Sequence, residues 1–393
     1  MATKNMIGRA LLLSWSVISV GLGVLSLRPA PSMFLLKLKV VVTEYGYVLA
    51  ALQCIALFMT CRLRSNTGKV FRELALASIL AGSLCTAAPL LHAIIYTRDL
   101  PRRFEAAFGA CSARPHSKRI FALHRLLKPW PVSSRSAEQI VFSRTDDSEL
   151  TLDLYCPPNP QSGGDPCVVV VHGGSWIQGT SRDFASLSPY LAAQGYVVAG
   201  INYRKADKHP FPAARDDLHG AIDYLKDNAS ELDVDKDRIA LLGRSAGGQL
   251  ALLVAYERGD PDIRGVVSFY GPTDMVYGFN DPTDPRVIDT PYTLGIYLRG
   301  TPDTARQEYE AASPINFVRY NSPPTLLLHG ASDEMVHVVQ SDRLAKQLEN
   351  YGVEHLYLRL PWATHGFDHN LRGPGGQIST YAVERFMERM LKE

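Results

Sequence analysis

The sequence predicts an α/β fold, a mostly parallel sheet flanked by helices, preceded by an α-helical transmembrane region. Two observations predict the sheet. From residue 137 onward, short apolar runs alternate with segments of helical periodicity, as in open sheets built from strand–helix units. These runs are apolar at successive positions, which suits strands buried on both faces. A third observation, that long apolar stretches are confined to the first hundred residues, predicts the membrane region.

Three apolar stretches, Ala10–Leu27, Val40–Thr60 and Leu74–Thr97, lie in that region. Each is long enough to cross the hydrocarbon core, which takes about 20 residues of α-helix. A cleaved signal peptide could account for the first stretch but not for the other two. The second carries one charge, Glu44, which we expect at a helix end within reach of the membrane interface. The alternative is that the stretches are buried helices of a soluble domain.

Loop charges and cysteines bear on the side of the membrane that holds the rest of the chain. Basic residues are divided equally between the two sides, but the short loop of residues 61–73 is the most basic and favours a cytoplasmic N-terminus. Three spans would then place the C-terminal domain on the non-cytoplasmic side. An oxidising compartment would permit a disulfide between Cys156 and Cys167, although two free thiols at strand ends fit their spacing better.

Residues 98–137 connect the three-helix transmembrane region, residues 1–97, to a catalytic domain expected at residues 138–393. Basic and apolar side chains are mixed in Arg102–Lys128, which predicts an amphipathic helix. Two interpretations stay open, an interfacial or cap helix and a helix packed on the following domain. The prolines and serines of residues 129–136 mark the boundary.

The composition excludes several classes of protein. Forty-one Lys and Arg against 39 Asp and Glu give a net charge of +2, and no basic stripe with interleaved aromatic residues points to nucleic acid. Six cysteines in 393 residues are too few for a disulfide scaffold. None of them forms a CxxC pair, so we expect no structural zinc.

The domain of residues 138–393 begins with two alternating segments, Gln139–Arg144 and Leu150–Tyr155, which predict a hairpin turning at Asp146–Asp147. Buried strands are expected at Cys167–Val171, Tyr196–Ile201, Arg238–Leu242, Gly265–Tyr270, Thr325–Leu328 and His355–Leu360. Helices are expected near residues 182–194, 214–229, 246–258, 338–351 and 377–391. The segment Pro272–Thr304 breaks this alternation and predicts an insertion at the edge of an active site.

A strand-to-helix turn carries the candidate nucleophile, Ser245. Residues 243–248 are G-R-S-A-G-G, a G-x-S-x-G pattern between an expected strand and an expected helix. Such a turn needs small residues on both sides of the serine because the backbone approaches itself closely. It would expose the hydroxyl at the C-terminal edge of the sheet, where the helix N-terminus favours developing negative charge.

A glycine-containing loop follows the strand Cys167–Val171, where residues 172–176 are H-G-G-S-W. We expect the backbone N–H groups of Gly173, Gly174 and Ala246 to form an oxyanion hole. His172 is expected to hold this loop by hydrogen bonds rather than to take part in chemistry. Trp176 either lines the substrate pocket or packs in the core.

A serine nucleophile needs a base, and the base needs a carboxylate that orients it. Asp333 follows the strand Thr325–Leu328 and His365 follows the strand His355–Leu360, so both loops should lie at the same sheet edge as Ser245. The competing residues are Glu334 and Asp274 for the acid, and His329 and His369 for the base.

These motifs resemble those of the α/β-hydrolase superfamily, and within it the esterases and lipases similar to hormone-sensitive lipase. The matching pieces are HGGSW at 172–176, GRSAGG at 243–248, HGASDEMV at 329–336 and THGF at 364–367, in the chain order Ser, Asp, His. The resemblance covers residues 138–393 and implies a Ser245–Asp333–His365 esterase without a cofactor.

Two residues depart from that pattern. Ser175 stands where the family usually has a third glycine, and Arg244 stands where the hormone-sensitive-lipase branch usually has Asp. Arg244 looks more like neighbouring branches such as feruloyl and acetylxylan esterases, kynurenine formamidase and isoprenylcysteine methylesterase. The last is similar in also joining membrane spans to this kind of domain, which the usual family pattern lacks.

The sequence therefore predicts a membrane-anchored serine hydrolase that cleaves carboxylic esters through an acyl-enzyme. Its expected partners are a small-molecule, lipophilic ester and the lipid bilayer, with no nucleic acid, no cofactor and no metal. An amidase or peptidase, an acyltransferase on the same triad, and a catalytically silent membrane binding module remain alternatives. The acyl chain length and the oligomeric state do not follow from the sequence.

Overall fold

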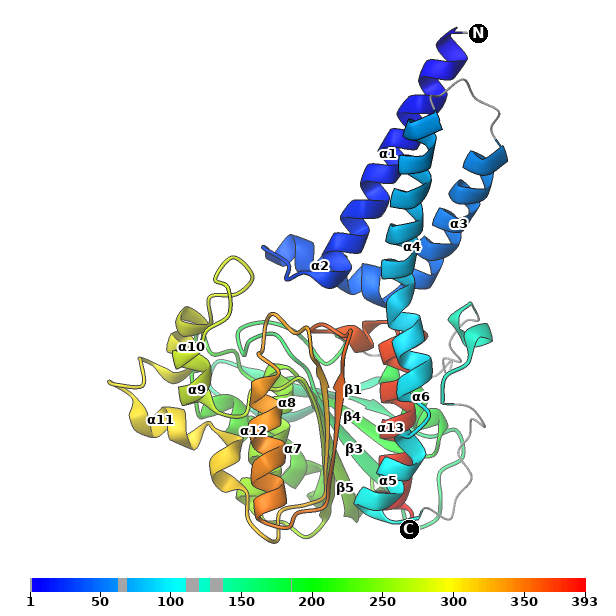
Figure 1. The fold of residues 1–393 in the computed structure, drawn as a ribbon. Helices are drawn as coiled ribbons and strands as arrows, with labels where there is room; N and C mark the ends of the chain where they lie inside the picture. Colours follow the sequence, from blue (N-terminus) through cyan, green and yellow to red (C-terminus); the bar gives the residue numbers. More distant parts are fainter. Residues whose placement is uncertain (1, 63–68, 111–119, 128–136, 185) are drawn as a thin grey trace.

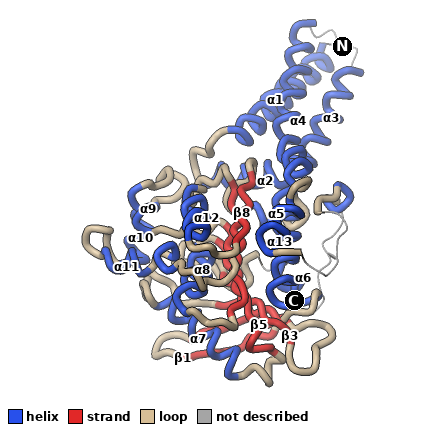
Figure 2. Tube along the Cα trace, turned by 60° about the horizontal axis from the view of Figure 1, so that its bottom comes forward, coloured by secondary structure: helices blue, strands red, loops and turns tan. Residues whose placement is uncertain are grey.

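The computed structural model describes residues 2–62, 69–110, 120–127, 137–184 and 186–393. An eight-stranded sheet in the order β1-β2-β4-β3-β5-β6-β7-β8 forms the centre of the C-terminal domain, with helices on both faces (Figures 1 and 2). The strands are β1 (Glu138–Arg144), β2 (Glu149–Tyr155), β3 (Asp165–Val171), β4 (Val197–Ile201), β5 (Val234–Arg244), β6 (Ile263–Phe269), β7 (Thr325–Gly330) and β8 (His355–Leu360).

The strand pairing confirms the predicted fold class. β1 and β2 form the expected antiparallel hairpin, and β2 joins β4 in antiparallel register. The pairs from β4 through β3 and β5 to β8 are parallel. Parallel strands end at the same edge, so the loops after β5, β7 and β8 are brought together there.

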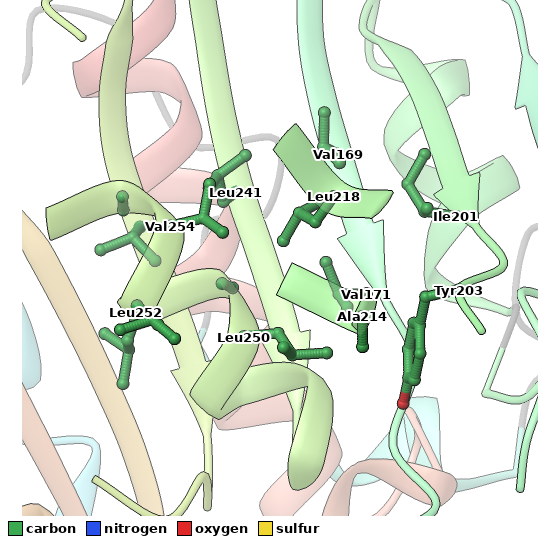
Figure 3. Close-up of a cluster of buried hydrophobic side chains, with 14 of the residues drawn as sticks. Val169, Val171, Ile201, Tyr203, Ala214, Leu218, Leu241, Leu250, Leu252 and Val254 are labelled. Carbon is green, nitrogen blue, oxygen red and sulfur yellow. The ribbon is translucent and has the colours of Figure 1, made fainter. Parts of the chain in front are cut away.

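Side chains of the central strands alternate between two apolar cores. Val169 and Val171 of β3 belong to one core with Leu218 of α7, whereas Val168 and Val170 belong to the core on the opposite face. Figure 3 shows the first core, where the strand valines meet helical leucines. Burial on both faces explains why these strands are apolar at every position. The helices are α6 (Leu187–Ala193), α7 (Ala213–Asp227), α8 (Ala246–Arg258), α12 (Val339–Asn350) and α13 (Pro374–Leu391).

The predicted insertion lies between β6 and β7. It is longer than the expected Pro272–Thr304, because helical segments continue to Phe317. Tyr297 and Tyr309 anchor it in the core, each with none of its surface exposed. Its elements are α9 (Met275–Asn280), α10 (Thr290–Leu298), α11 (Arg306–Ala311) and the 3-10 helix η2 (Pro314–Phe317).

Where three helices were expected in the N-terminal region, its described residues form four: α1 (Ala2–Leu27), α2 (Met33–Glu44), α3 (Gly46–Arg62) and α4 (Lys69–Tyr96). Among the described residues, α4 is long and apolar enough to span a membrane, and α1 contributes a shorter apolar helix from Leu12. The predicted second span, Val40–Thr60, is not one straight helix. The chain bends there by 75° between α2 and α3, so that together they make one broken candidate span at most.

Glu44 lies at the bend between α2 and α3 and binds the C-terminal domain there. It ends α2 as expected, but its side chain does not reach out to an interface; it is completely buried against the C-terminal domain. The backbone N–H of Gly375 donates a hydrogen bond of 2.9 Å to Glu44 Oε2, and the Asn370 side chain donates one of 3.1 Å to the Glu44 carbonyl. α2 therefore lies across the base of α1, α3 and α4, between them and the sheet domain (Figure 1).

The connector packs on the C-terminal domain, which corresponds to the second of its two interpretations. Helix α5 (Leu100–Phe108) buries Phe104 and Phe108, and the Phe108 ring meets Phe386 of α13 at 5.1 Å between centroids. A 3-10 helix, η1 (Leu123–Leu126), follows. The boundary predicted at residues 129–136 lies outside the described residues. No disulfide joins Cys156 and Cys167, and burial raises the pKa of Cys167 to about 12.

Candidate active site

Ser245 lies in a strained turn between β5 and α8. Its backbone has φ 53° and ψ −123°, a combination that residues other than glycine rarely adopt. A Cβ atom on Gly243 would lie 2.0 Å from the Gly247 carbonyl oxygen, and one on Gly247 would lie 2.2 Å from the Val171 oxygen. Both glycines are therefore required by the close approach of the backbone, as the sequence pattern predicts.

The structure brings the three predicted chemical groups into one line. His365 Nε2 lies 3.0 Å from Ser245 Oγ, and His365 Nδ1 lies 2.7 Å from Asp333 Oδ2. The serine hydroxyl can thus donate to a neutral imidazole whose other nitrogen donates to the carboxylate. This is the arrangement that activates a serine for attack on a carbonyl.

Asp333 is held as a carboxylate. Its Oδ1 accepts hydrogen bonds of 2.9 Å from the backbone N–H groups of Met335 and Val336. Burial raises the pKa of the Asp333 carboxyl, but the charges of His365 and His329 and hydrogen bonds from both outweigh burial. The net effect is a pKa well below the usual range, so the Asp333 carboxyl is ionised at neutral pH.

The competing acids are engaged elsewhere. Asp274 caps α9 by accepting from the Tyr277 N–H at 2.9 Å, and it forms an ion pair of 2.7 Å with Arg343. Glu334 forms an ion pair with Lys39 of α2. Neither carboxylate contacts His365.

The competing bases also lie outside this line. His329 is completely buried, and its Nδ1 lies 2.7 Å from the Ser341 hydroxyl. His329 Nε2 lies 3.2 Å from Asp333 Oδ2, the oxygen that His365 also contacts, so His329 helps to fix the acid. His369 is exposed and packs edge-on against Phe184.

The loop with the two glycines abuts the nucleophile turn. A Cβ on Gly173 would lie 3.1 Å from the Ser245 Cβ, and Gly174 has a φ of 117° with its Cβ direction blocked by the Gln178 carbonyl oxygen. Backbone N–H groups from this loop and from Ala246 are therefore adjacent to Ser245. Ser175, at the position where the family usually has a third glycine, also adopts a positive φ, 54°.

His172 holds this loop, as expected. It stacks on Tyr203 at 4.3 Å, and the Tyr203 hydroxyl donates to the His172 carbonyl at 3.0 Å. Lys205 Nζ lies 2.9 Å from His172 Nε2, and His172 Nδ1 lies 2.5 Å from the Gly173 carbonyl oxygen. Burial, reinforced by the charge of Lys205, lowers the pKa of His172 to about 4, so the ring is neutral at physiological pH.

A buried polar network behind the site was not predicted. The Arg244 guanidinium donates to Asp368 Oδ2 at 2.5 Å, and the Tyr270 hydroxyl donates to Asp368 Oδ1 at 2.5 Å. The Tyr270 ring in turn packs against His365. The sequence marks Arg244 only as a departure from a family pattern. Its partner Asp368, 124 residues later, lies in no recognisable motif.

Two hollows meet at Ser245. A narrow cavity of about 60 Å³ has apolar walls that include Trp176, Met275 and Leu294. A wider cleft of about 520 Å³ lies over Gly173, Gly174 and His365. Trp176 does both things expected of it, because it lines the narrow cavity and also stacks on Tyr297 at 4.2 Å. No group of three or more His, Cys, Asp or Glu side chains that could hold a metal ion is present among the described residues.

Comparisons with known proteins agree with this fold. The BD-FAE family model matches residues 152–348, which include Ser245 and Asp333. Esterase LipC of Mycobacterium tuberculosis is 32% identical over 263 residues, 62% of this chain and 63% of that protein. The probable carboxylic ester hydrolase LipM of the same organism is 30% identical over 251 residues, 60% of this chain and 57% of that protein. The matched part thus spans less than two thirds of these relatives.

A solved structure is similar over the same domain. A truncated form of a carbohydrate esterase from gut microbiota is superimposed with a TM-score of 0.54 at 22% identity, covering 65% of this chain and 99% of that one. At this identity the likeness shows the fold, which is that of the α/β-hydrolases. The resemblance to esterases predicted from the motifs is confirmed for the sheet domain.

Proposed function

Because the chain belongs to the BD-FAE family, we propose that it is a membrane-anchored serine hydrolase that cleaves carboxylic esters through a Ser245–Asp333–His365 triad. The observation that carries this proposal is the pair of contacts at His365, 3.0 Å to Ser245 Oγ and 2.7 Å to Asp333 Oδ2. The esterase names of LipC and LipM support the same reaction class for this chain.

The proposed reaction has two halves. Ser245 Oγ attacks the ester carbonyl while His365 Nε2 takes the hydroxyl proton, and the tetrahedral oxyanion accepts hydrogen bonds from the N–H groups of Gly173, Gly174 and Ala246. His365 then gives the proton to the departing alcohol, which leaves an acyl-enzyme on Ser245. A water molecule, deprotonated by His365, releases the acid and restores the serine.

Asp333 acts through His365. Its Oδ2 accepts from Nδ1–H, which fixes the tautomer in which Nε2 can take the serine proton. Its charge also stabilises the imidazolium that forms in each half-reaction. The two backbone N–H bonds to Oδ1 keep this carboxylate from rotating away.

Exposed apolar side chains support membrane anchoring. On α1, Val17 and Val24 are 63% and 53% exposed, and on α4, Leu74 and Leu84 are 63% and 61% exposed. Exposing such apolar surface to water costs free energy, roughly 25 cal/mol for each Å². This cost disappears when the surface is in hydrocarbon. We therefore infer that the membrane region of residues 1–97 inserts in a bilayer and that the substrate is a lipophilic ester.

A labelling experiment tests the reaction. The full-length chain in detergent or proteoliposomes should be labelled covalently by a fluorophosphonate probe, and Ser245→Ala should not. Hydrolysis of an ester should greatly exceed that of the matching anilide. Absence of labelling would leave the silent binding module as the better account, and a preference for the anilide would favour the amidase.

A protection experiment tests the proposed non-cytoplasmic location of the catalytic domain. Proteinase added to intact cells should digest or release that domain and leave fragments of the membrane region. Digestion only after lysis would place the domain in the cytoplasm.

A further inference from the structure

Helix α2 contacts both loops that carry the candidate acid and base. Near its middle, Lys39 forms an ion pair with Glu334, the neighbour of Asp333 in the loop after β7. At its end, the Glu44 carbonyl accepts from the Asn370 side chain in the loop that carries His365, and the Glu44 carboxylate accepts from the Gly375 N–H at the start of α13. The N-terminal region therefore touches the site at two points, through one rigid element.

The Lys39–Glu334 pair is largely removed from solvent. The Lys39 side chain is 3% exposed and the Glu334 side chain 14%. Lys39 Nζ also donates a hydrogen bond of 3.0 Å to the carbonyl of Arg28, where the chain leaves α1. Breaking a buried pair by removing one partner is costly because the other charge is left uncompensated.

Other charged groups around this pair are paired among themselves. From the segment before α10, Asp284 and Arg286 form an ion pair of 2.6 Å. His337, from the same loop as Glu334, lies 3.0 Å from Asp281. Among the described residues, Lys39 is thus the cation that contacts Glu334.

The charged groups on the His365 side are also accounted for. Asp333 Oδ2 accepts from His365 and also lies 3.2 Å from His329. The Tyr270 ring packs against His365, Arg244 is paired with Asp368, and exposed His369 lines the same cleft as His365. Because these groups are paired with one another, removing Lys39 or Glu334 would leave one uncompensated charge beside them.

We propose that Lys39 is a positioning residue for the reaction, which it serves by neutralising Glu334 and holding the loop that carries Asp333. The inference rests on the proposed function of Ser245, His365 and Asp333. The N-terminal region would then contribute to catalysis, since Lys39 of α2 neutralises Glu334 in the loop that carries Asp333.

The test compares Lys39→Met, Glu334→Gln and the double variant by measuring kcat/KM for a water-soluble ester against pH. Lys39→Met leaves an uncompensated negative charge on Glu334, next to the Asp333 that binds His365; this charge favours the imidazolium, so the acid limb of the profile should move to higher pH by about 0.5 to 1 unit. Glu334→Gln leaves a positive charge and should move the limb to lower pH. The double variant should return it toward its original position.

Each single variant should also lose activity at the pH optimum, by about 2- to 100-fold, the range expected for coupled neighbours. Lys226→Met is the matched control. Lys226 pairs with Asp260 and Asp262 ahead of β6, at the sheet edge opposite Ser245, and its loss should leave the acid limb in place.

The outcomes separate the inference from the proposed function. Acid limbs that stay fixed, or that move in the same direction in both single variants, would overturn the role of Lys39 in a chain that still takes the fluorophosphonate label. If Lys39→Met does not fold, the Glu334→Gln limb alone decides, and it must move to lower pH. A wild-type chain that takes no label would overturn the proposed function and this inference together.

Discussion

The ring of Tyr270 packs on the imidazole of His365 with 4.3 Å between the ring centroids, and its hydroxyl is bound to Asp368. Asp368 also accepts from Arg244, the residue directly before Ser245. The turn that carries Ser245 is therefore joined to His365 by two buried hydrogen bonds to Asp368 and one contact between rings. Tyr270 restricts the His365 ring by packing against it, so the distance between Nε2 and Ser245 Oγ also depends on the Asp368 and Arg244 contacts that hold Tyr270.

The Arg244–Asp368 pair predicts a large effect on stability. Arg244→Met leaves the buried Asp368 carboxylate without its cation, so we expect the free energy of unfolding to fall by about 3–5 kcal/mol. Thermal unfolding of the purified protein measures this. Arg286→Met is the control, because its pair with Asp284 is on the surface and should contribute only about 0–1 kcal/mol. Equal losses in both variants would contradict the structural role of Arg244.

The nucleophile assignment predicts a loss of activity without a loss of structure. Ser245→Ala should lower kcat by about 10⁴-fold or more, because it removes the hydroxyl that lies 3.0 Å from His365 Nε2. Its unfolding temperature should stay close to that of the wild-type chain, since the hydroxyl contributes little to packing. Normal turnover by the folded variant would rule out Ser245.

The acid assignment predicts a sharp difference between two aspartates. Asp333→Asn should lose far more activity than Asp274→Asn, because Asp333 contacts His365 whereas Asp274 caps α9 and pairs with Arg343. An asparagine at 333 favours the wrong imidazole tautomer, a change that costs about 10⁴-fold in serine proteases. An Asp274→Asn variant that is the less active of the two would transfer the acid role to the loop after β6.

His172 predicts an acid sensitivity of the fold. Its pKa is about 4 in the folded protein and 6.5 in the unfolded chain, so between these values the unfolded state binds more protons. Stability therefore rises with pH across this window and is lost as pH falls through it, by about 3 kcal/mol for this one group. His172→Asn, which cannot titrate, should flatten the dependence of unfolding temperature on pH between 4 and 6.5. An unchanged slope would show that other groups dominate there.

Local patterns were sufficient for the sheet domain. Strands buried on both faces are apolar at every position, so β3, β5 and β7 could be located to within a few residues, and the elbow glycines identified Ser245. Asp333 and His365 followed because the loops of parallel strands meet at one edge.

Contacts between distant segments could not be predicted in this way. The break between α2 and α3 depends on Glu44 binding to Gly375, 331 residues later, and hydropathy alone made one span of both helices. The Lys39–Glu334 and Tyr270–Asp368 contacts join residues 295 and 98 apart. Nothing in their local sequence marks these residues as parts of a site.

The narrow cavity beside Ser245 predicts the acyl group that is accepted. Its volume is about 60 Å³, against about 520 Å³ for the wider cleft, so a short acyl group fits it best. In a series of p-nitrophenyl esters, kcat/KM should be highest for short acyl chains and should fall as the chain lengthens. A rise through the longest chains would place the acyl group in the wider cleft instead.

A matched pair of leucine variants locates that limit. Leu294 is 3% exposed and forms part of the cavity wall, so Leu294→Ala should move the optimum to longer acyl chains. Leu358 of β8 is completely buried in the core on the opposite face, and Leu358→Ala should destabilise the fold without moving the optimum. Both changes should cost about 2–5 kcal/mol of stability, so a difference in chain length between them reflects the cavity and not the loss of packing. An optimum that stays the same in Leu294→Ala would mean that the acyl chain does not enter this cavity.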